Sequence, residues 1–215
     1  MSTPPRIAVV DYGAGNLKSV TKALVRSGLA PEVTADPGAV RAAQAVVLPG
    51  VGAFADAVAN LRERGLADAV LASIEAGRPY LGICLGLQVL FEESEEHGRT
   101  EGLGCLGGRV ERFADVDEAG QPLRVPHIGW NRVVFDGSHP MCSQLPREDH
   151  FYFVHSYRAV PAQASICVGH AEYGGAFAAA VARDNVFAVQ FHPEKSQSAG
   201  KRVLDAFAAW VASCV

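Results

Sequence analysis

Cysteine is scarce in this chain, and its few copies follow no pattern. The 215 residues include five cysteines, an odd number, and no two of them form a Cys-x-x-Cys pair. Neither a disulfide framework nor a zinc site is therefore indicated. The seven histidines form no His-x-His or His-Glu-x-x-His pattern either. We therefore expect no metal centre.

The chain also lacks an excess of positive charge and any long apolar run. Nineteen Lys and Arg against 23 Asp and Glu give a net charge of −4, with no basic cluster. This argues against a nucleic-acid partner. No apolar run approaches the ~20 residues that span a bilayer, so we expect no membrane partner. The apolar run 7–10 is too short for a signal peptide, and we expect a cytoplasmic protein.

What the chain has is a core-forming composition, with 49% hydrophobic and 20% charged residues. This predicts one domain over residues 1–215. In the first half, apolar strands alternate with helical patterns, which predicts an α/β fold with a mostly parallel sheet flanked by helices. The predicted strands here are 7–10, 32–34, 45–48 and the run ending at residue 84, and the predicted helices are 16–27 and about 54–76.

The second half has a different pattern, with short strands punctuated by glycine and proline. It predicts an additional antiparallel portion of the fold. The predicted strands are 109–113, 131–135, 150–157, 165–173, 176–182 and 186–191, and the predicted final helix is about 199–212. No linker or repeat separates the two halves, so we expect them to form one unit.

Residues 80–88 (YLGICLGLQ) form an apolar strand, a cysteine and an apolar helix in immediate succession. Gly82 and Gly86 remove side-chain bulk where the strand and helix backbones converge. This arrangement predicts a nucleophile elbow, with Cys84 exposed in a sharp and strained turn. Taken alone, Cys84 would more simply be a small core residue.

Residues 189–196 (VQFHPEKS) supply a base and a group to orient it. Pro193 biases His192 towards an extended backbone, in which residues two apart project to the same face. Glu194 can then accept a hydrogen bond from one imidazole nitrogen while the other addresses Cys84. A lone histidine is usually structural, but two independent segments that agree on one mechanism predict a Cys-His-Glu triad.

Two glycine-containing loops are expected at the carboxyl ends of the strands, where ligands bind. Residues 11–16 (DYGAGN) suggest a dinucleotide fingerprint, but Lys18 stands where its third glycine belongs, so we expect no cofactor. Residues 49–54 (PGVGAF) can turn backbone N–H groups towards a ligand. Together with the N–H of Leu85, this loop suits an oxyanion hole, although a tight turn alone would have the same composition.

The chain resembles class I, triad-type glutamine amidotransferase domains over nearly its whole length. The elbow and FHPE (191–194) define this class. A narrower resemblance, to members that act in histidine biosynthesis, rests on five further blocks in order: DYGAGN (11–16), PGVGAF (49–54), LFEESEE (90–96), PHIGWN (126–131) and YFVHSY (152–157). The resemblance implies a flavodoxin-like α/β fold and a single glutamine amidotransferase type 1 domain.

The resemblance also implies an activity and a partner. Cys84 attacks the side-chain amide of L-glutamine, ammonia leaves, and water releases glutamate from a thioester. The ammonia passes to a (β/α)8-barrel cyclase subunit that forms a heterodimer with the glutaminase. At Ser19 some relatives carry an asparagine that bonds to the barrel, so the resemblance does not imply this contact here.

Further residue roles follow from the resemblance alone. Glutamine-binding positions match Gln88, Glu96 and the backbones of Ser156 and Tyr157; the oxyanion hole matches Gly52 and Leu85; partner-facing positions match Asn16, Trp130 and Lys195; and a gate near the ammonia exit matches Tyr152. From composition alone, Glu96 belongs to a solvated acidic run, and Tyr152 and Trp130 to the core. Asn16 and Lys195 would similarly be a helix cap and a solvated charge.

Two other classes of function stay open. The first is another glutaminase, such as the subunit of pyridoxal phosphate synthase, or a free-standing γ-glutamyl hydrolase; these share the elbow but should lack PHIGWN (126–131). The second is a non-enzymatic flavodoxin-like interaction module with a chance cysteine. Its cysteine would be inert to a glutamine-analogue electrophile, whereas a nucleophilic Cys84 would be alkylated.

Overall fold

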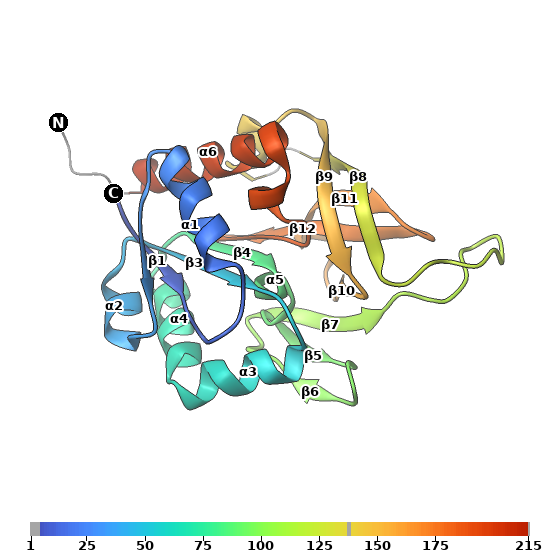
Figure 1. Cartoon of the computed structure of the whole chain (residues 1–215), viewed down its shortest axis with the longest axis horizontal. Coiled ribbons are helices and arrows are strands. Elements are labelled where there is room, and N and C mark those ends of the chain that lie inside the picture. The colour runs from blue at the N-terminus through green and yellow to red at the C-terminus, as the bar shows by residue number, and fades with distance from the viewer. Residues whose placement is uncertain (1–4, 137–138, 215) are drawn as a thin grey trace.

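The computed structural model describes residues 5–136 and 139–214, and within them the strands form two sheets (Figure 1). The larger sheet has, in spatial order, β2 (Ala30–Thr34), β1 (Arg6–Val10), β3 (Ala45–Gly50), β4 (Tyr80–Cys84), β13 (Val186–Val189), β12 (Ala176–Arg183), β11 (Cys167–Glu172), β8 (His127–Phe135) and β9 (Glu148–His155). The smaller sheet has β10 (Tyr157–Pro161), β7 (Leu106–Arg112), β5 (Phe91–Ser94) and β6 (Thr100–Glu101).

Pairing in the larger sheet changes along its width. Neighbours from β2 to β13 are parallel, and those from β13 to β9 are antiparallel. The predicted α/β class, with a parallel core and an antiparallel portion from the second half, is therefore confirmed. β13 comes from the second half of the chain but joins the parallel part, beside β4.

Helices cover both faces of the parallel part of the sheet (Figure 1). On one face lie α1 (Leu17–Arg26) and α6 (Gln197–Ser213), and on the other α2 (Pro37–Ala42), α3 (Phe54–Glu63) and α4 (Leu66–Glu75). The short α5 (Leu85–Gln88) follows β4, and the 3-10 turns are η1 (Cys142–Gln144), η2 (Ala164–Ile166) and η3 (Pro193–Lys195).

Strand β1 shows why the apolar runs are unbroken. Ile7 and Val9 belong to the hydrophobic cluster that includes α1 and α6, whereas Ala8 and Val10 belong to the cluster beneath α2, α3 and α4. All four are at most 2% exposed. A strand buried on both faces needs apolar residues at every position, and each fully buried large side chain stabilises the fold by about 1.5–3 kcal/mol.

Two predicted elements are each divided in the structure. The predicted helix 54–76 is two helices, α3 and α4, because Gly65 takes a left-handed conformation with φ 67° between them. The predicted strand 150–157 is also two strands, β9 and β10, which separate at Ser156 and belong to different sheets. Side-chain alternation continues through Ser156, so the pattern alone could not reveal this change of sheet.

Helix α2 and the small strands β5 and β6 had no counterpart in the prediction. Helix α2 begins with a recognisable cap, since Asp36 accepts a hydrogen bond from the Gly38 N–H and Pro37 stands at the first helical position. β5 contains Glu92 and Glu93 between buried Phe91 and Ser94. Its charges hide the strand signal, and its edge partner β6 has only two residues.

The register of three parallel strands sets the position of the elbow. In the β3–β4 pair Gly50 lies opposite Cys84, and in the β4–β13 pair Ile83 lies opposite Val189. The carboxyl ends of these strands therefore meet at one edge of the sheet. Residues that follow β3, β4 and β13 are brought together there, although they come from both halves of the sequence.

Glycine is required where β4 turns into α5. A Cβ on Gly86 would lie 1.8 Å from the Leu48 carbonyl oxygen, and a Cβ on Gly82 would lie 2.5 Å from that of Gly86. Both distances are far below contact, and both obstacles are backbone atoms that cannot rotate away. The predicted role of these two glycines in close backbone approach is borne out.

We expect Gly86→Ala to lower the free energy of unfolding by about 3 kcal/mol or more, at or beyond the upper end for overpacked sites. Gly107→Ala is the matched control, because a Cβ there would meet Ala162 at an ordinary 3.6 Å, and its effect should stay within about 0.5 kcal/mol. Urea unfolding of both variants checks this. Equal effects at the two positions would contradict it.

Candidate active site

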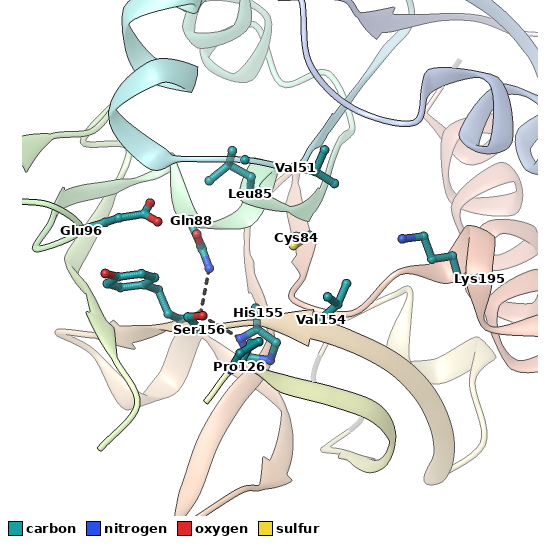
Figure 2. A pocket seen from close by; sticks show the side chains of 12 residues that line it. Val51, Cys84, Leu85, Gln88, Glu96, Pro126, Val154, His155, Ser156 and Lys195 are labelled. Carbon is teal, nitrogen blue, oxygen red and sulfur yellow. Dashed lines mark hydrogen bonds between the residues drawn. The ribbon is translucent and has the colours of Figure 1, made fainter. Parts of the chain in front are cut away.

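A pocket of about 440 Å³ lies at the carboxyl ends of β3 and β4. Figure 2 shows Gln88 and Glu96 on one side of Cys84 and Lys195 on the other. The lining residues are Val51, Gly52, Cys84, Leu85, Gln88, Glu96, Pro126, Val154, His155, Ser156, Tyr157 and Lys195. This volume suits a small ligand, and the lining includes eight positions that the sequence analysis assigned to catalysis, the oxyanion hole, substrate or the partner.

Cys84 lies at the junction of β4 and α5 with φ 54° and ψ −105°. A non-glycine residue at positive φ is strained, and such strain persists only where the surroundings enforce it. The predicted elbow geometry is therefore present. Cys84 is nevertheless only 7% exposed, so the expectation of an exposed thiol is wrong. Cys84 lines the pocket together with Val51 and Leu85, and a ligand reaches the sulfur from there.

His192 and Glu194 form a buried pair. His192 Nδ1 lies 2.8 Å from Glu194 Oε1, and the two side chains are 2% and 3% exposed. The other imidazole nitrogen, Nε2, has no hydrogen-bond partner among the described residues. Nδ1 is thus held by the carboxylate, and Nε2 is left for proton exchange with Cys84.

The charge state of His192 is set by its neighbours. Burial by itself lowers the pKa of His192, but hydrogen bonding and charge interactions with Cys84 and Glu194 more than offset this and raise it to about 9. The imidazolium therefore persists through neutral pH. The His192 imidazolium therefore lies between the Cys84 and Glu194 side chains and interacts with both.

The backbone that presents Glu194 differs from the prediction. His192 is extended, with φ −106° and ψ 96°, as the following proline predicts, but Glu194 lies in the 3-10 turn η3 and not in an extended stretch. Ser196 fixes this turn, since its hydroxyl donates to the His192 carbonyl at 2.7 Å and accepts from the Tyr152 N–H at 2.9 Å. Extended geometry was the wrong reason for a correct pairing.

Gln88 and Glu96 line the same wall of the pocket. Gln88 Nε2 donates to the Tyr157 carbonyl oxygen at 3.0 Å. Glu96 Oε2 accepts from the Phe54 N–H at 2.6 Å, at the start of α3, where a helix dipole favours a carboxylate. The composition-based reading of Glu96 as part of a solvated face is wrong, because the side chain is partly buried against this helix and faces the pocket.

Ser156 and Tyr157 lie where the chain passes from one sheet to the other. The Ser156 carbonyl accepts from the Phe113 N–H at 3.0 Å, and the Tyr157 carbonyl accepts from Gln88 and from His155 Nδ1, the latter at 2.8 Å. Burial, followed by the charge of Glu96, raises the pKa of the Tyr157 hydroxyl. Both carbonyls already have protein donors, so their N–H groups are the backbone atoms to consider for a ligand.

The predicted oxyanion positions flank Cys84. Leu85 is the first residue of α5, and β3 leads directly into Gly52 after the Gly50–Cys84 pairing. Gly52 has φ 105°, and a Cβ there would meet nothing within 4 Å. Glycine is therefore favoured at this position by backbone conformation and not by lack of space.

Two buried histidines, His127 and the pocket-lining His155, had no individual role in the sequence analysis. Burial lowers the pKa of His127 to about 4 and that of His155 to about 3. His155 Nδ1 donates to the Tyr157 carbonyl, so its Nε2 accepts from His127 Nδ1 at 3.2 Å. Both rings are neutral at physiological pH, in contrast to His192.

The four predicted partner or gate residues are found in two places. Trp130 is 48% exposed and its ring centroid lies 6.3 Å from that of Tyr152, while Lys195 Nζ lies 5.8 Å from the Tyr152 centroid. These three therefore form one contiguous group at the pocket, and Trp130 is not a core aromatic. Asn16 is a helix cap, since its side chain accepts from the Ser19 N–H at the start of α1.

Residues 5–136 and 139–214 provide neither a metal site nor a membrane-spanning helix. No group of three or more His, Cys, Asp or Glu side chains there is placed to hold a metal ion. None of the helices formed by those residues has the length and apolarity needed to cross a membrane.

Comparisons with known proteins agree on one family. The family model for glutamine amidotransferase class-I matches residues 8–209. The chain is 53% identical over 209 residues to imidazole glycerol phosphate synthase subunit HisH of Methylococcus capsulatus, covering 95% of this chain and 96% of that one. With HisH of Syntrophotalea carbinolica the identity is 50% over 202 residues, covering 94% and 98%.

A solved structure shows the same fold at lower identity. PurLQS from Thermotoga maritima superposes with a TM-score of 0.75 at 20% identity, covering 97% of this chain and 99% of that one. At this identity the likeness supports the fold alone.

The state of His192 leads to a pH prediction. Its pKa of about 9 in the folded chain lies above the ordinary 6.5, so the stabilisation from the imidazolium is complete below pH 6.5 and is lost as the pH rises through about 9. In NMR spectra of histidine-labelled protein, His192 should titrate near pH 9. Glu194→Gln and Cys84→Ser should each move this titration to lower pH.

Two further variants complete this experiment. His192→Asn identifies the resonance, and His127 and His155 act as internal controls that stay neutral from pH 6 to 10, because their pKa values are about 4 and 3. A His192 titration near 6.5 in the wild-type protein would show that the neighbouring negative charges do not control the imidazole.

Proposed function

The chain belongs to the class-I glutamine amidotransferase family, and from this premise we propose that it is the glutaminase subunit of an imidazole glycerol phosphate synthase. It hydrolyses glutamine to glutamate and ammonia and delivers the ammonia to a (β/α)8-barrel cyclase subunit in histidine biosynthesis. The observation that carries the proposal is the buried His192–Glu194 pair, whose free Nε2 serves the strained Cys84 at the pocket. Relatives about half identical over nearly all of the chain, each named HisH, support the specific reaction.

In the first step the Cys84 thiolate attacks the side-chain amide carbon of glutamine. The amide oxygen gains negative charge, which the backbone N–H of Leu85 and the loop at Gly52 stabilise. The tetrahedral intermediate then collapses as His192 Nε2 gives its proton to the departing nitrogen. Ammonia leaves, and a γ-glutamyl thioester remains on the sulfur.

In the second step the thioester is hydrolysed. His192, now neutral, takes a proton from water at Nε2, and the resulting hydroxide attacks the thioester carbon. Collapse expels the Cys84 thiolate and releases glutamate. Glu194 keeps Nδ1–H directed at its Oε1 throughout, which fixes the ring and stabilises the imidazolium whenever it forms.

The α-ammonium and α-carboxylate groups of glutamine are bound at the side of the pocket that Gln88 and Glu96 line. The carboxylate of Glu96 suits the α-ammonium group, and Gln88 offers an amide beside it. The carbonyls of Ser156 and Tyr157 already accept hydrogen bonds from the protein. Their N–H groups are therefore assigned to the α-carboxylate, which needs donors.

The cyclase docks on the surface next to the pocket. Ile128 and Trp130 are 58% and 48% exposed on β8, and exposed apolar side chains beside a functional pocket favour a protein interface. Lys195 both lines the pocket and contacts the ring of Tyr152. In this proposal Tyr152 gates the ammonia exit, and Asn16 with Lys195 contacts the barrel.

We also infer one amidotransferase domain over residues 1–215 and a cytoplasmic location. The nucleophile ends β4 and the base follows the adjacent strand β13 of the same sheet, which favours a single functional unit. The cysteines of the described chain, Cys84 included, are free thiols, and a catalytic free thiol is best maintained in a reducing compartment.

A free-standing glutaminase is the second candidate, because the chain carries all three triad residues itself. It differs from the first in whether a partner is needed. The half-exposed Trp130 next to the pocket favours the partner-dependent reading, since an enzyme acting alone has no use for an apolar surface there.

We expect Cys84→Ala and Cys84→Ser to lower glutamine hydrolysis by about 10⁴-fold or more. Folding and cyclase binding should be retained, because the thiol adds chemistry and little packing volume, and free ammonia should still support the cyclase reaction. His192→Asn should be nearly as damaging and Glu194→Gln milder. The measurements are glutamate release and product formation with glutamine or with ammonia.

Full additivity in triad double mutants would argue against a shared mechanism, since residues that act as a unit do not contribute independently. Retention of most glutamine-dependent turnover in Cys84→Ala would show that another group is the nucleophile.

The purified chain should be a poor glutaminase alone and should be activated by the cyclase, most of all when an acceptor analogue occupies the cyclase site. The motivating feature is Gly52, whose backbone can take up more than one conformation next to Cys84. Docking that aligns one oxyanion donor would supply ~2.7–4 kcal/mol, or a hundred- to thousandfold activation. Glutamate release is measured for the chain alone, with cyclase, and with cyclase plus analogue.

Trp130→Ala should weaken this activation without changing the basal rate of the isolated chain. Val33→Ala, which truncates a similarly exposed apolar side chain on the edge strand β2 at 44% exposure, is the control and should leave activation intact. Equal rates of glutamate release by the wild-type chain alone, with cyclase, and with cyclase plus analogue would refute activation by the cyclase and favour a free-standing hydrolase.

A further inference from the structure

Gln190 is a buried amide directly behind the nucleophile. It follows β13, is 0% exposed, and its side chain bonds at both ends. Its Oε1 lies 3.1 Å from Gln88 Nε2, and its Nε2 lies 3.6 Å from Cys84 Sγ. The backbone N–H of Gln190 donates to the Ala179 carbonyl at 2.9 Å, which fixes the residue on the sheet.

The carbonyl group of Tyr157 fixes the donor and the acceptor of each hydrogen bond that links Gln88, Gln190 and Cys84. The Tyr157 carbonyl can only accept, so the Gln88 atom 3.0 Å from it must be the NH₂ group. That same NH₂ group has a second hydrogen, which requires an acceptor on Gln190, namely Oε1. The NH₂ group of Gln190 is then left facing Cys84 Sγ.

A donor at this position suits a thiolate. Cys84 is 7% exposed, and a buried anion needs compensating hydrogen bonds. His192 supplies a charge but must give up its proton during the reaction. A neutral amide cannot transfer a proton, so its donor remains in place at every stage.

We propose that Gln190 is a positioning residue of the nucleophile: its amide N–H donates to the Cys84 sulfur and stabilises and orients the thiolate, and its carbonyl ties that donor to Gln88 in the substrate wall. The inference rests on the proposed glutaminase chemistry at Cys84. The sequence analysis gave no role to Gln190, a polar residue directly after the apolar strand β13. Gln190 is fully buried and does not line the pocket, so its effect is exerted through Cys84 and Gln88.

Two substitutions test the donor. Gln190→Met keeps the length and volume of the side chain and removes both hydrogen bonds. Gln190→Glu keeps an acceptor for Gln88 but, when ionised, places an oxygen next to the sulfur where the donor was. If the donor matters, reactivity of Cys84 should fall in the order wild type, Gln190→Met, Gln190→Glu at pH 8.

The first readout is alkylation of Cys84 by a glutamine-analogue chloroketone, followed by mass spectrometry of the peptide that contains Cys84. We expect Gln190→Met to react about ten- to hundredfold more slowly at pH 7, the range for losing a hydrogen bond to a charged group. The midpoint of its rate–pH profile should move upward by about one to two pH units. In the complex with the cyclase, kcat for glutamate release should fall in proportion.

Ser73→Ala is the matched control for loss of a buried polar group. Ser73 is 1% exposed in α4 and its hydroxyl donates to the Ala69 carbonyl at 2.8 Å, far from the pocket lining. It should lower the thermal midpoint without changing the rate–pH profile of alkylation. If Gln190 had only a structural role, Gln190→Met would behave like Ser73→Ala, with a lower thermal midpoint and an unchanged rate–pH profile of alkylation. That result would overturn the inference.

The outcomes separate this inference from the proposed function. Failure of the wild-type complex to release glutamate, together with an inert Cys84, would refute the proposed function itself. An active wild type with either Gln190 variant alkylated at the wild-type rate would refute only the role of Gln190. A shifted profile in Gln190→Met, with a slower Gln190→Glu, supports it.

Discussion

The parallel pairing of β4 with β13 is the constraint on which the rest of the site depends. Ile83 lies opposite Val189, so the elbow at Cys84 and the segment that carries His192 leave the sheet side by side. A slip of one residue would turn alternate side chains to the opposite face of the sheet. Because both strands are buried on both faces, hydrogen bonds and core packing together hold this register, and the two halves of the triad meet without any direct chain connection.

Several features of the site are energetically unfavourable by themselves, and the surrounding fold must stabilise them. Cys84 has a strained positive φ, the elbow glycines lie where no side chain fits, and the His192–Glu194 pair is almost fully removed from solvent. Buried charges are tolerated when each has a partner. Here the Glu194 carboxylate is the partner of the His192 imidazolium, and the amide of Gln190 adds a donor behind the Cys84 sulfur.

The second sheet gives the pocket its other wall. The chain leaves the large sheet after β9 and enters the small one at β10, and Ser156 and Tyr157 lie at this passage. The Tyr157 carbonyl collects hydrogen bonds from Gln88 and His155. One peptide group therefore links the buried neutral histidines, the substrate wall and, through Gln88 and Gln190, the nucleophile.

The sequence by itself determined the α/β class, the elbow, the pairing of His192 with Glu194 and the family, because these depend on local periodicity, glycine placement and contiguous motifs. Tertiary structure alone decided that Gly65 divides the long helix, that the predicted strand 150–157 is divided between two sheets at Ser156, and that Glu194 is presented from a 3-10 turn. It also decided that Glu96 faces a pocket and that Gln190 bonds to Cys84. Such features depend on which distant segments become neighbours in the fold. The type of a single residue does not reveal which side chains will surround it.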